Sequence, residues 1–202
     1  MAITINGTGT IAGISSGGIN DDVVDAGTIA ANSRMVLEQF YTPCDGSVIA
    51  TSAGNITVGD VDAVQSLTTT HTDVTGSSIT YTPPAGTTQV IYEFYFELAY
   101  VDSNPNSHFK FFIDSDEVTD SRTTLAANYR EGREFFKWGI NIGGSAVTAT
   151  GRQASWSSAK TLKLQAREYG SSNESKLHET KHWDGGVNSV FSIQQIGITA
   201  IG

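Results

Sequence analysis

The chain has 202 residues and a mass of 21.5 kDa, with 39% apolar and only 16% charged residues. This length fits one domain of ordinary size with an extension. There are 21 acidic against 12 basic residues, giving a formal charge of −9. Because a nucleic-acid-binding surface needs the opposite sign, we expect no nucleic-acid partner.

Residues 1–33 cannot fold by themselves and yet do not resemble a disordered linker. Single Ile and Val residues are spaced by Gly, Ser and Thr, without an aromatic residue or a proline. Isolated aliphatic side chains can each fill a small pocket but cannot close a core. A soluble linker, in contrast, is depleted in Ile and Val. We therefore predict an extended N-terminal arm whose aliphatic side chains pack into pockets of a neighbouring subunit.

The first residues lack the basic region and the continuous apolar stretch of a secretory signal peptide. No apolar run approaches the roughly 20 residues that cross a bilayer, so we expect no membrane insertion and assembly in a cytoplasm. Cys44 is the single cysteine, which excludes a disulfide within the chain. With no histidines close to it in sequence, its thiol is predicted to be buried near a turn.

One helix signal lies in residues 30–41, AANSRMVLEQFY. Asn32 or Ser33 could cap a short helix, and the alternative is an extended connector. The TPCDG sequence that follows ends either one. We assign residues 34–54 to this connector and residues 55–202 to a folded domain.

From there the chain alternates apolar and polar residues, the period of β-strands. The clearest strand is VIYEFYFELAY at residues 90–100, where one face carries Val90, Tyr92, Phe94, Phe96 and Leu98. The alternation recurs at residues 108–113, 134–142, 161–168 and 188–202, whereas the Thr-rich residues 66–82 are typical of an edge or an exposed face. About eight strands predict an all-β fold, an antiparallel β-sandwich of the jelly-roll type, with a β-barrel as the alternative.

The four histidines, His71, His108, His178 and His182, do not lie in a nucleophile elbow or beside Cys44. His178 and His182 belong to HETKH, which matches the HExxH pattern of zinc proteases. That motif needs a helix, whereas these residues alternate like a strand, which would place the two imidazoles about 13 Å apart. We predict strand histidines that face solvent or a neighbour, not one metal site.

Two further patterns invite a functional interpretation. DSDEVTD contains Asp114, Asp116, Glu117 and Asp120, but it lacks the central Gly and terminal Glu of an EF-hand. We predict a solvated hairpin turn there, with a weak calcium site at an interface as the alternative. GTGTIAG and NIGGSA lack the spacing of phosphate-binding loops and are predicted to be turns.

Several aromatic residues outside the alternating core pattern form another candidate surface. They are expected in the core or at subunit contacts, and the alternative is a carbohydrate-binding face. No catalytic, cofactor-binding or metal-ligating residue is assigned from the sequence. The aromatic residues concerned are Tyr95, Tyr100, Tyr129, Trp156, Tyr169 and Trp183.

The opening MAITINGTGTIAGISSGGI, followed by VDAGTIA, resembles the N-terminal arms of virion structural proteins from tailed phages of marine bacteria, including cyanophages. The stretches SSITYTPPAGTTQVIYEF, HFKFFIDSDEVT, KWGINIGG, GRQASWSSAKTLKLQAREY, HWDGG and IGITAIG resemble the β-sandwich of such proteins. The resemblance covers most of the chain. It implies a trimeric, surface-exposed phage component of the tail-fibre or capsid-decoration type, without enzymatic activity and without cofactors.

Within this class we expect a capsid decoration or cement protein on the virion surface, anchored by the arm. The chain is short and lacks the shaft repeats of a long fibre. The alternative is a short tail-fibre or receptor-binding protein, whose arm enters a tail protein and whose distal loops recognise host surface glycan. An enzyme would depend on HETKH or on a carboxylate pair.

Overall fold

The computed structural model describes residues 34–100, 106–126, 132–171, 174–180, 190–191 and 194–202, and its regular structure there is β-strand with one short 3-10 turn. The first strands are β1 (Val36–Pro43), β2 (Val48–Thr51), β3 (Gly54–Thr57), β4 (Gln65–Ser66), β5 (Thr72–Asp73), β6 (Ile79–Tyr81) and β7 (Gln89–Tyr100). They are followed by β8 (Asn106–Ile113), β9 (Asp116–Ala126), β10 (Gly132–Asn141), the 3-10 turn η1 (Thr148–Thr150), β11 (Lys160–Glu168), β12 (Ser175–Leu177), β13 (Glu179–Thr180), β14 (Val190–Phe191) and β15 (Gln195–Ile201).

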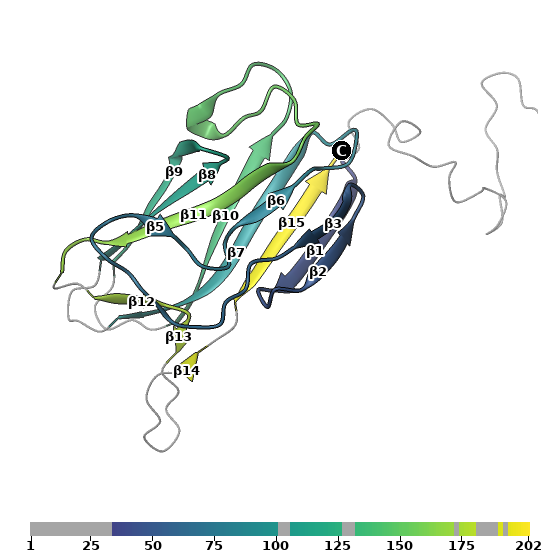
Figure 1. Ribbon diagram of the computed structural model, residues 1–202. Helices are drawn as coiled ribbons and strands as arrows, with labels where there is room; N and C mark the ends of the chain where they lie inside the picture. Colours follow the sequence, from purple (N-terminus) through teal and green to yellow (C-terminus); the bar gives the residue numbers. More distant parts are fainter. Residues whose placement is uncertain (1–33, 101–105, 127–131, 172–173, 181–189, 192–193) are drawn as a thin grey trace, which may run out of the picture. The chain divides into compact units, whose positions relative to one another are not determined.

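The strands pair in the order of a long hairpin folded back on itself. The first strand, β1, pairs with the last, β15; β5 and β6 together pair with β11; β7 pairs with β10, and β8 with β9. All these pairs are antiparallel. Rolling the hairpin then brings β15 beside β7 and β11 beside β8, which completes two sheets (Figure 1). This is jelly-roll topology.

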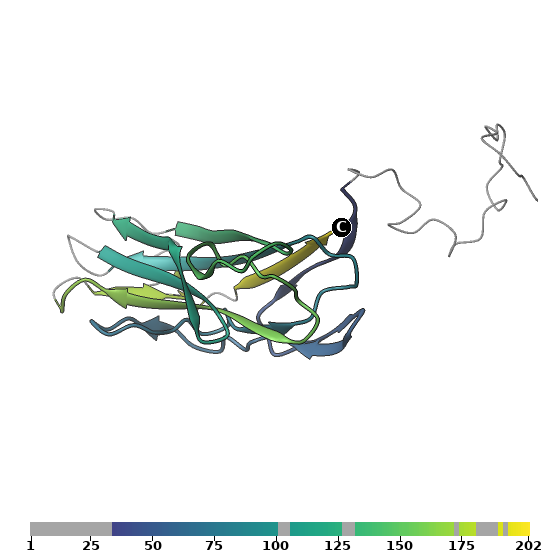
Figure 2. The ribbon, with the colours of Figure 1, turned by 90° about the horizontal axis from the view of Figure 1, so that it is seen from above.

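The two sheets stack as separate layers (Figure 2). One has the order β1-β15-β7-β10, with β12 and β4 continuing beside the far end of β7, and the other has the order β5-β11-β8-β9. Within the described residues the neighbouring edges β9 and β10 do not pair with each other, so the sheets remain an open sandwich and not a barrel. The predicted all-β antiparallel sandwich is confirmed.

The core lies between the sheets and is dominated by aromatic rings. The inward residues of β7 are at most 2% exposed, as their alternation predicts. Phe111 on β8 lies 5.0 Å from Tyr92 and 5.4 Å from Phe136, measured between ring centroids. Tilted and edge contacts at such distances add to the free energy of burying the rings, so this ladder across the two sheets stabilises the sandwich.

Residues 34–54 do not form a helix. The sequence left open a short helix or an extended connector, and the structure has the extended form. This segment belongs to the folded domain, because β1 pairs with β15 from Val36 to Pro43. The compact unit accordingly begins at Val36, not at residue 55. Phe40 faces the core and the β1 register is fixed by its partner, so tertiary pairing overrides the weak local helix signal. Residues 1–33 lie outside the described residues.

Candidate functional site

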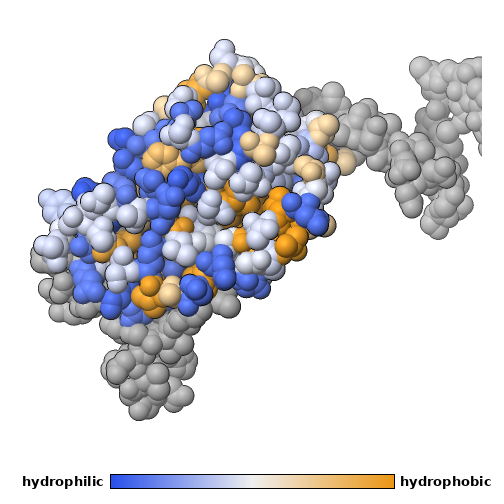
Figure 3. Space-filling view, viewed as in Figure 1, coloured by the Kyte–Doolittle hydropathy of each residue, from blue (hydrophilic) through white to orange (hydrophobic). Residues whose placement is uncertain are grey.

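The outer face of the β5-β11-β8-β9 sheet contains a basic hollow of about 430 Å³. Hydrophilic residues, in blue, and residues of intermediate hydropathy, in pale tones, predominate on the surface where β11 lies (Figure 3). We call this hollow the basic pocket. It is lined by His71, His108, Phe109, Lys110, Arg122, Thr123, Thr124 and Arg167.

The strand register brings these residues together from distant parts of the sequence. Phe109 and Phe111 of β8 point into the core, so His108 and Lys110 point outward between them. His108 lies opposite Arg167 of β11 on one side and opposite Thr124 of β9 on the other. Its Nδ1 lies 3.0 Å from Oγ1 of Thr124 and its ring contacts that of Tyr169.

Three basic side chains of the basic pocket, Lys110, Arg122 and Arg167, lie near one carboxylate, that of Glu117. Lys110 and Arg122 both contact Glu117, at 3.1 and 2.5 Å, whereas the Arg167 Nη1 donates to the backbone oxygen of Thr69, at 3.4 Å. The local charge is therefore positive although the chain as a whole is acidic.

The two imidazoles of the basic pocket do not add to this charge near neutral pH. Burial, and then the charges of Lys110 and Arg167, lower the pKa of His71 below its ordinary value. Burial and the charge of Arg167 also lower the pKa of His108. Both rings are therefore held neutral, and each becomes a cation more readily once a negative group neutralises its neighbours.

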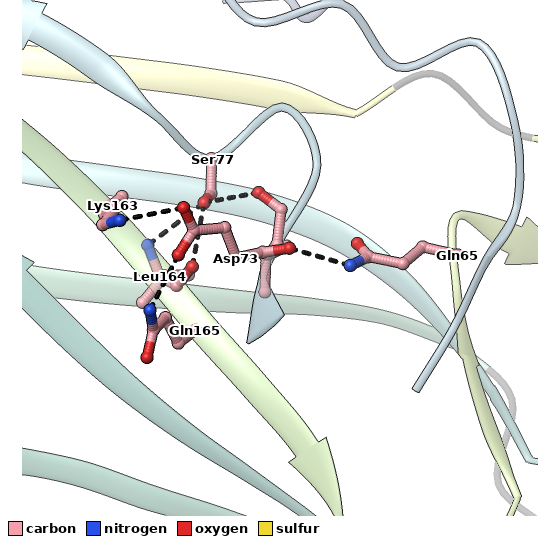
Figure 4. A network of polar contacts seen from close by, with 7 residues as sticks. Gln65, Asp73, Ser77, Lys163, Leu164 and Gln165 are labelled. Atoms are coloured by element: carbon pink, nitrogen blue, oxygen red, sulfur yellow. Dashed lines mark hydrogen bonds and ion pairs between the residues drawn. The ribbon is translucent and has the colours of Figure 1, made fainter. Parts of the chain in front are cut away.

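A network of polar contacts holds the segment that carries His71 against β11 (Figure 4). The Asp73 carboxylate accepts from Lys163 Nζ and Gln165 Nε2, both at 2.8 Å. The backbone oxygen of Asp73 accepts from Gln65 Nε2, also at 2.8 Å, and the buried Ser77 hydroxyl accepts from the backbone N–H of Leu164 at 3.1 Å. His71, two residues before Asp73, is positioned by these contacts.

A second hollow, of about 370 Å³, lies at the open side of the sandwich between β9 and β10. Its lining combines aromatic residues, among them Phe96, Phe136 and Trp138, with polar and charged ones such as Asp120 and Lys137. Phe135, which also lines this hollow, is 64% exposed, and its ring stacks on that of Tyr95 with centroids 6.0 Å apart.

The outer face of the β1-β15-β7-β10 sheet carries a buried carboxylate, Glu93, which is 4% exposed. The hydroxyl of Tyr41 donates to Glu93, and Lys137 Nζ lies 3.0 Å from it. Burial alone would raise the pKa of Glu93, but these two partners outweigh burial and hold the pKa below its ordinary value. We find in this group a structural ion pair and no reactive acid.

The HETKH residues are not in a helix. His178 lies between β12 and β13 with φ of 66° and is 0% exposed, so of the two predicted surroundings, solvent or a neighbour, solvent is excluded. Burial lowers its pKa to about 4. Glu179 begins β13, and His182 lies outside the described residues. Among the described residues there is no group of three or more His, Cys, Asp or Glu side chains placed to hold a metal ion.

The acidic run 114–120 spans the β8–β9 hairpin. Asp114 and Ser115 form its two-residue turn, with φ of 56° at Asp114, which confirms the predicted tight connection. The carboxylate of Asp114 accepts from Thr161 N at 2.8 Å and pairs with Lys160, whereas Glu117 pairs with Lys110 and Arg122. These carboxylates are thus engaged by separate cations.

Cys44 is buried, as predicted, in tightly packed backbone. Its Sγ lies 3.5 Å from the oxygen of Gly76, where φ is 79° and a β-carbon would stand 2.2 Å from Val61. Only glycine fits there without displacing its neighbours. Burial raises the pKa of Cys44 to about 12, so its thiol is not a nucleophile at neutral pH.

The candidate aromatic residues do not share one face. Trp156 is in the core, Tyr95 lies on the outer face of one sheet, and Tyr169, 63% exposed, lies beside the basic pocket of the other. The side chain of Tyr100, together with Tyr129 and Trp183, lies outside the described residues.

The sequence did not indicate the grouping of His71, His108 and Arg167. Alternation in HFKFF and KLQAR could have placed His108 and Arg167 on outward faces. It could not have placed them opposite each other, because β9, β10 and η1 lie between them along the chain.

In the described part of the chain no helix is long and apolar enough to cross a membrane.

No protein-family model matches the chain, and no curated protein matches it. The chain is similar to two solved structures, of the Gx and Gt strains of infectious bursal disease virus, each at 10% identity. The TM-scores are 0.26 and 0.25 over 77% of this chain. The matches cover 49% and 50% of those chains, so this chain spans about half their length.

Proposed function

We propose that this chain is a non-enzymatic phage virion structural protein, a trimeric capsid decoration or cement protein anchored by residues 1–33. Jelly rolls recur in viral capsid domains, and they also serve as lectins and enzymes. The fold is therefore compatible with a virion structural protein but does not single out that class. The choice within that class rests on the surface of the sandwich and on the resemblance of the sequence to phage virion proteins.

The observation that carries the proposal is the aromatic outer face of the β1-β15-β7-β10 sheet. Tyr41 on the edge strand β1 is 49% exposed, and Phe135 on the opposite edge strand β10 is 64% exposed. An antiparallel sheet that faces water on one side is normally polar there. Exposed aromatic residues at both edges favour burial against other copies of the sandwich, and a ring of three copies closes such contacts around one axis.

A non-enzymatic role is supported by the state of the chemically competent groups. Cys44 and His178 are buried, and Glu93 and Glu117 are committed to ion pairs. None of these four groups is both exposed and unpaired. A structural protein requires no more of them.

A second candidate is a short tail-fibre or receptor-binding protein that recognises host surface glycan. The basic pocket favours it, since a capsid-attachment role does not require a cationic hollow on the outer face of the β5-β11-β8-β9 sheet. Labelling the protein on intact particles separates the two. Copies over the whole shell support decoration, whereas a few copies at one vertex overturn it in favour of the tail.

The oligomeric state is tested on the full chain by light scattering after size-exclusion chromatography. We expect a trimer, and Phe135→Asp should shift it toward monomer. Tyr169→Asp is the matched control, because Tyr169 is 63% exposed but lies on the other sheet. A stable monomer of the unaltered chain, or equal loss of trimer in both variants, would contradict the proposal.

A further inference from the structure

We propose that the basic pocket is a binding site for an oxyanion group, carboxylate or sulfate, carried by an acidic glycan. The proposal rests on the second candidate function, the recognition of surface glycan, for which it names the site and the ligand chemistry, and it does not depend on the trimer. It rests on the three cations of the pocket, on its unpartnered buried nitrogens and on its size.

Three residues that line the basic pocket each have a buried side-chain nitrogen that lacks a hydrogen-bond partner within the described residues. These nitrogens are Nε2 of His71, Nε2 of His108 and Nε of Arg167. Buried polar atoms are nearly always paired in folded proteins, and leaving one unpaired costs about 1–3 kcal/mol. Three of the buried unpaired atoms thus belong to residues that line this one hollow, which supports a hydrogen-bonding ligand there, whereas the others, on Asn106, Ser107 and His178, lie outside its lining.

The charge of the pocket selects the sign of that ligand. Lys110, Arg122 and Arg167 outnumber the single carboxylate of Glu117. A metal cation would be repelled by them. An oxyanion accepts hydrogen bonds from guanidinium and imidazole groups, and such charge-assisted bonds are stronger than neutral ones.

The dimensions of the pocket favour a ligand larger than an inorganic ion. A hollow of about 430 Å³ is in the range of small-molecule sites, and a lone sulfate fills only a part of it. Tyr169 lies beside the pocket, 63% exposed, with its ring 5.9 Å from that of His108. An exposed aromatic ring at the rim offers a flat apolar surface to a sugar ring.

The site is also built to hold its shape. His108 is fixed by Thr124, and the segment bearing His71 is held on β11 by Asp73. The remaining cations project from the strands β8, β9 and β11. Binding groups held on rigid strands pay little ordering entropy when a ligand arrives.

Calorimetry on the full chain tests the proposal with four probes: sulfate, inorganic phosphate, an oligogalacturonate and a neutral oligosaccharide of equal length. We expect the acidic probes to bind and Arg167→Gln to weaken them about tenfold, the loss of one charge-assisted contact. Arg152→Gln, which removes the same charge from the exposed loop after η1, should bind as the unaltered chain does.

The outcomes divide cleanly. Oligogalacturonate binding tighter than sulfate supports a glycan, and binding of the inorganic ions alone overturns the glycan while keeping the oxyanion. Absence of binding by every acidic probe, equal binding of the neutral oligosaccharide, or equal weakening by Arg152→Gln overturns the site. Should Arg167→Gln unfold, Arg122→Gln replaces it, because the Arg122 side chain is 57% exposed.

Discussion

The ring of Tyr41 lies over the backbone of Gly197, so closely that a β-carbon at Gly197 would stand 2.3 Å from Cδ1 and Cε1 of the tyrosine. Gly197 pairs with Tyr41 on one side and with Glu93 on the other. The missing side chain lets the tyrosine cross β15 and donate its hydroxyl to Glu93. Gly197 of β15 thereby allows a side-chain contact between β1 and β7.

Gly197→Ala should lower the free energy of unfolding by about 1–3 kcal/mol, because the methyl group displaces the Tyr41 ring from its contact with Glu93. Urea denaturation measures this. Gly139→Ala is the control, since Gly139 is also in a strand, β10, and its β-carbon would meet only the flexible end of Gln89, at 3.4 Å. Equal losses in the two variants would contradict the role given to the tyrosine.

His178 should make the sandwich less stable in acid. Its pKa is about 4 in the folded chain and about 6.5 when unfolded, so between these values only the unfolded chain binds the proton. The free energy of unfolding therefore falls as pH drops from about 6.5 to 4, by about 3 kcal/mol in all, and this contribution is constant below that window.

Denaturation curves at several pH values check this, with His178→Asn as the variant. Asparagine tolerates the positive φ of 66° and does not titrate. The variant should lose the slope that His178 contributes, whereas the slopes due to His71 and His108 remain in both chains. Parallel pH profiles would show that His178 does not bear the proton.

The affinity of the basic pocket for sulfate should rise as pH falls from 7 to 5. A bound anion favours the protonated imidazoles of His71 and His108, whose pKa values are lowered in the free chain. Calorimetry in two buffers of different ionisation enthalpy should register proton uptake. A pH-independent affinity would contradict this coupling. The other charged groups around the two rings are Lys110, Arg122, Arg167 and Glu117.

Deletion of residues 1–33 should leave a folded domain that no longer joins the particle. The core residues of the described chain begin at Phe40, and the compact unit begins at Val36. Thermal denaturation should give a midpoint within a few degrees of that of the full chain. Re-addition to particles lacking the protein should succeed with the full chain alone. Binding of the shortened chain would contradict the anchoring role of the arm.

The sequence predicts the middle of this fold better than its edges. In β7, β8 and β11 a strict alternation of large apolar residues identifies both the strand and its buried face. In β1, residues such as Leu37 and Glu38 fit a helix or a strand equally, and only pairing with β15 decides between them. The basic pocket could not be predicted from the sequence for a related reason. Its residues lie on four separate segments, and their meeting depends on the register between strands.

Because β1 pairs with β15, the sandwich is closed by contacts that span most of the chain. The Gln39 amide donates to the Thr199 hydroxyl across 160 positions. During synthesis β1 has no partner until residues 195–201 have left the ribosome, so the final sheet must form after translation of the whole domain. Folds dominated by such distant contacts fold slowly. A chaperone that shields β1 in the interval should raise the yield of folded protein more than it raises the final stability.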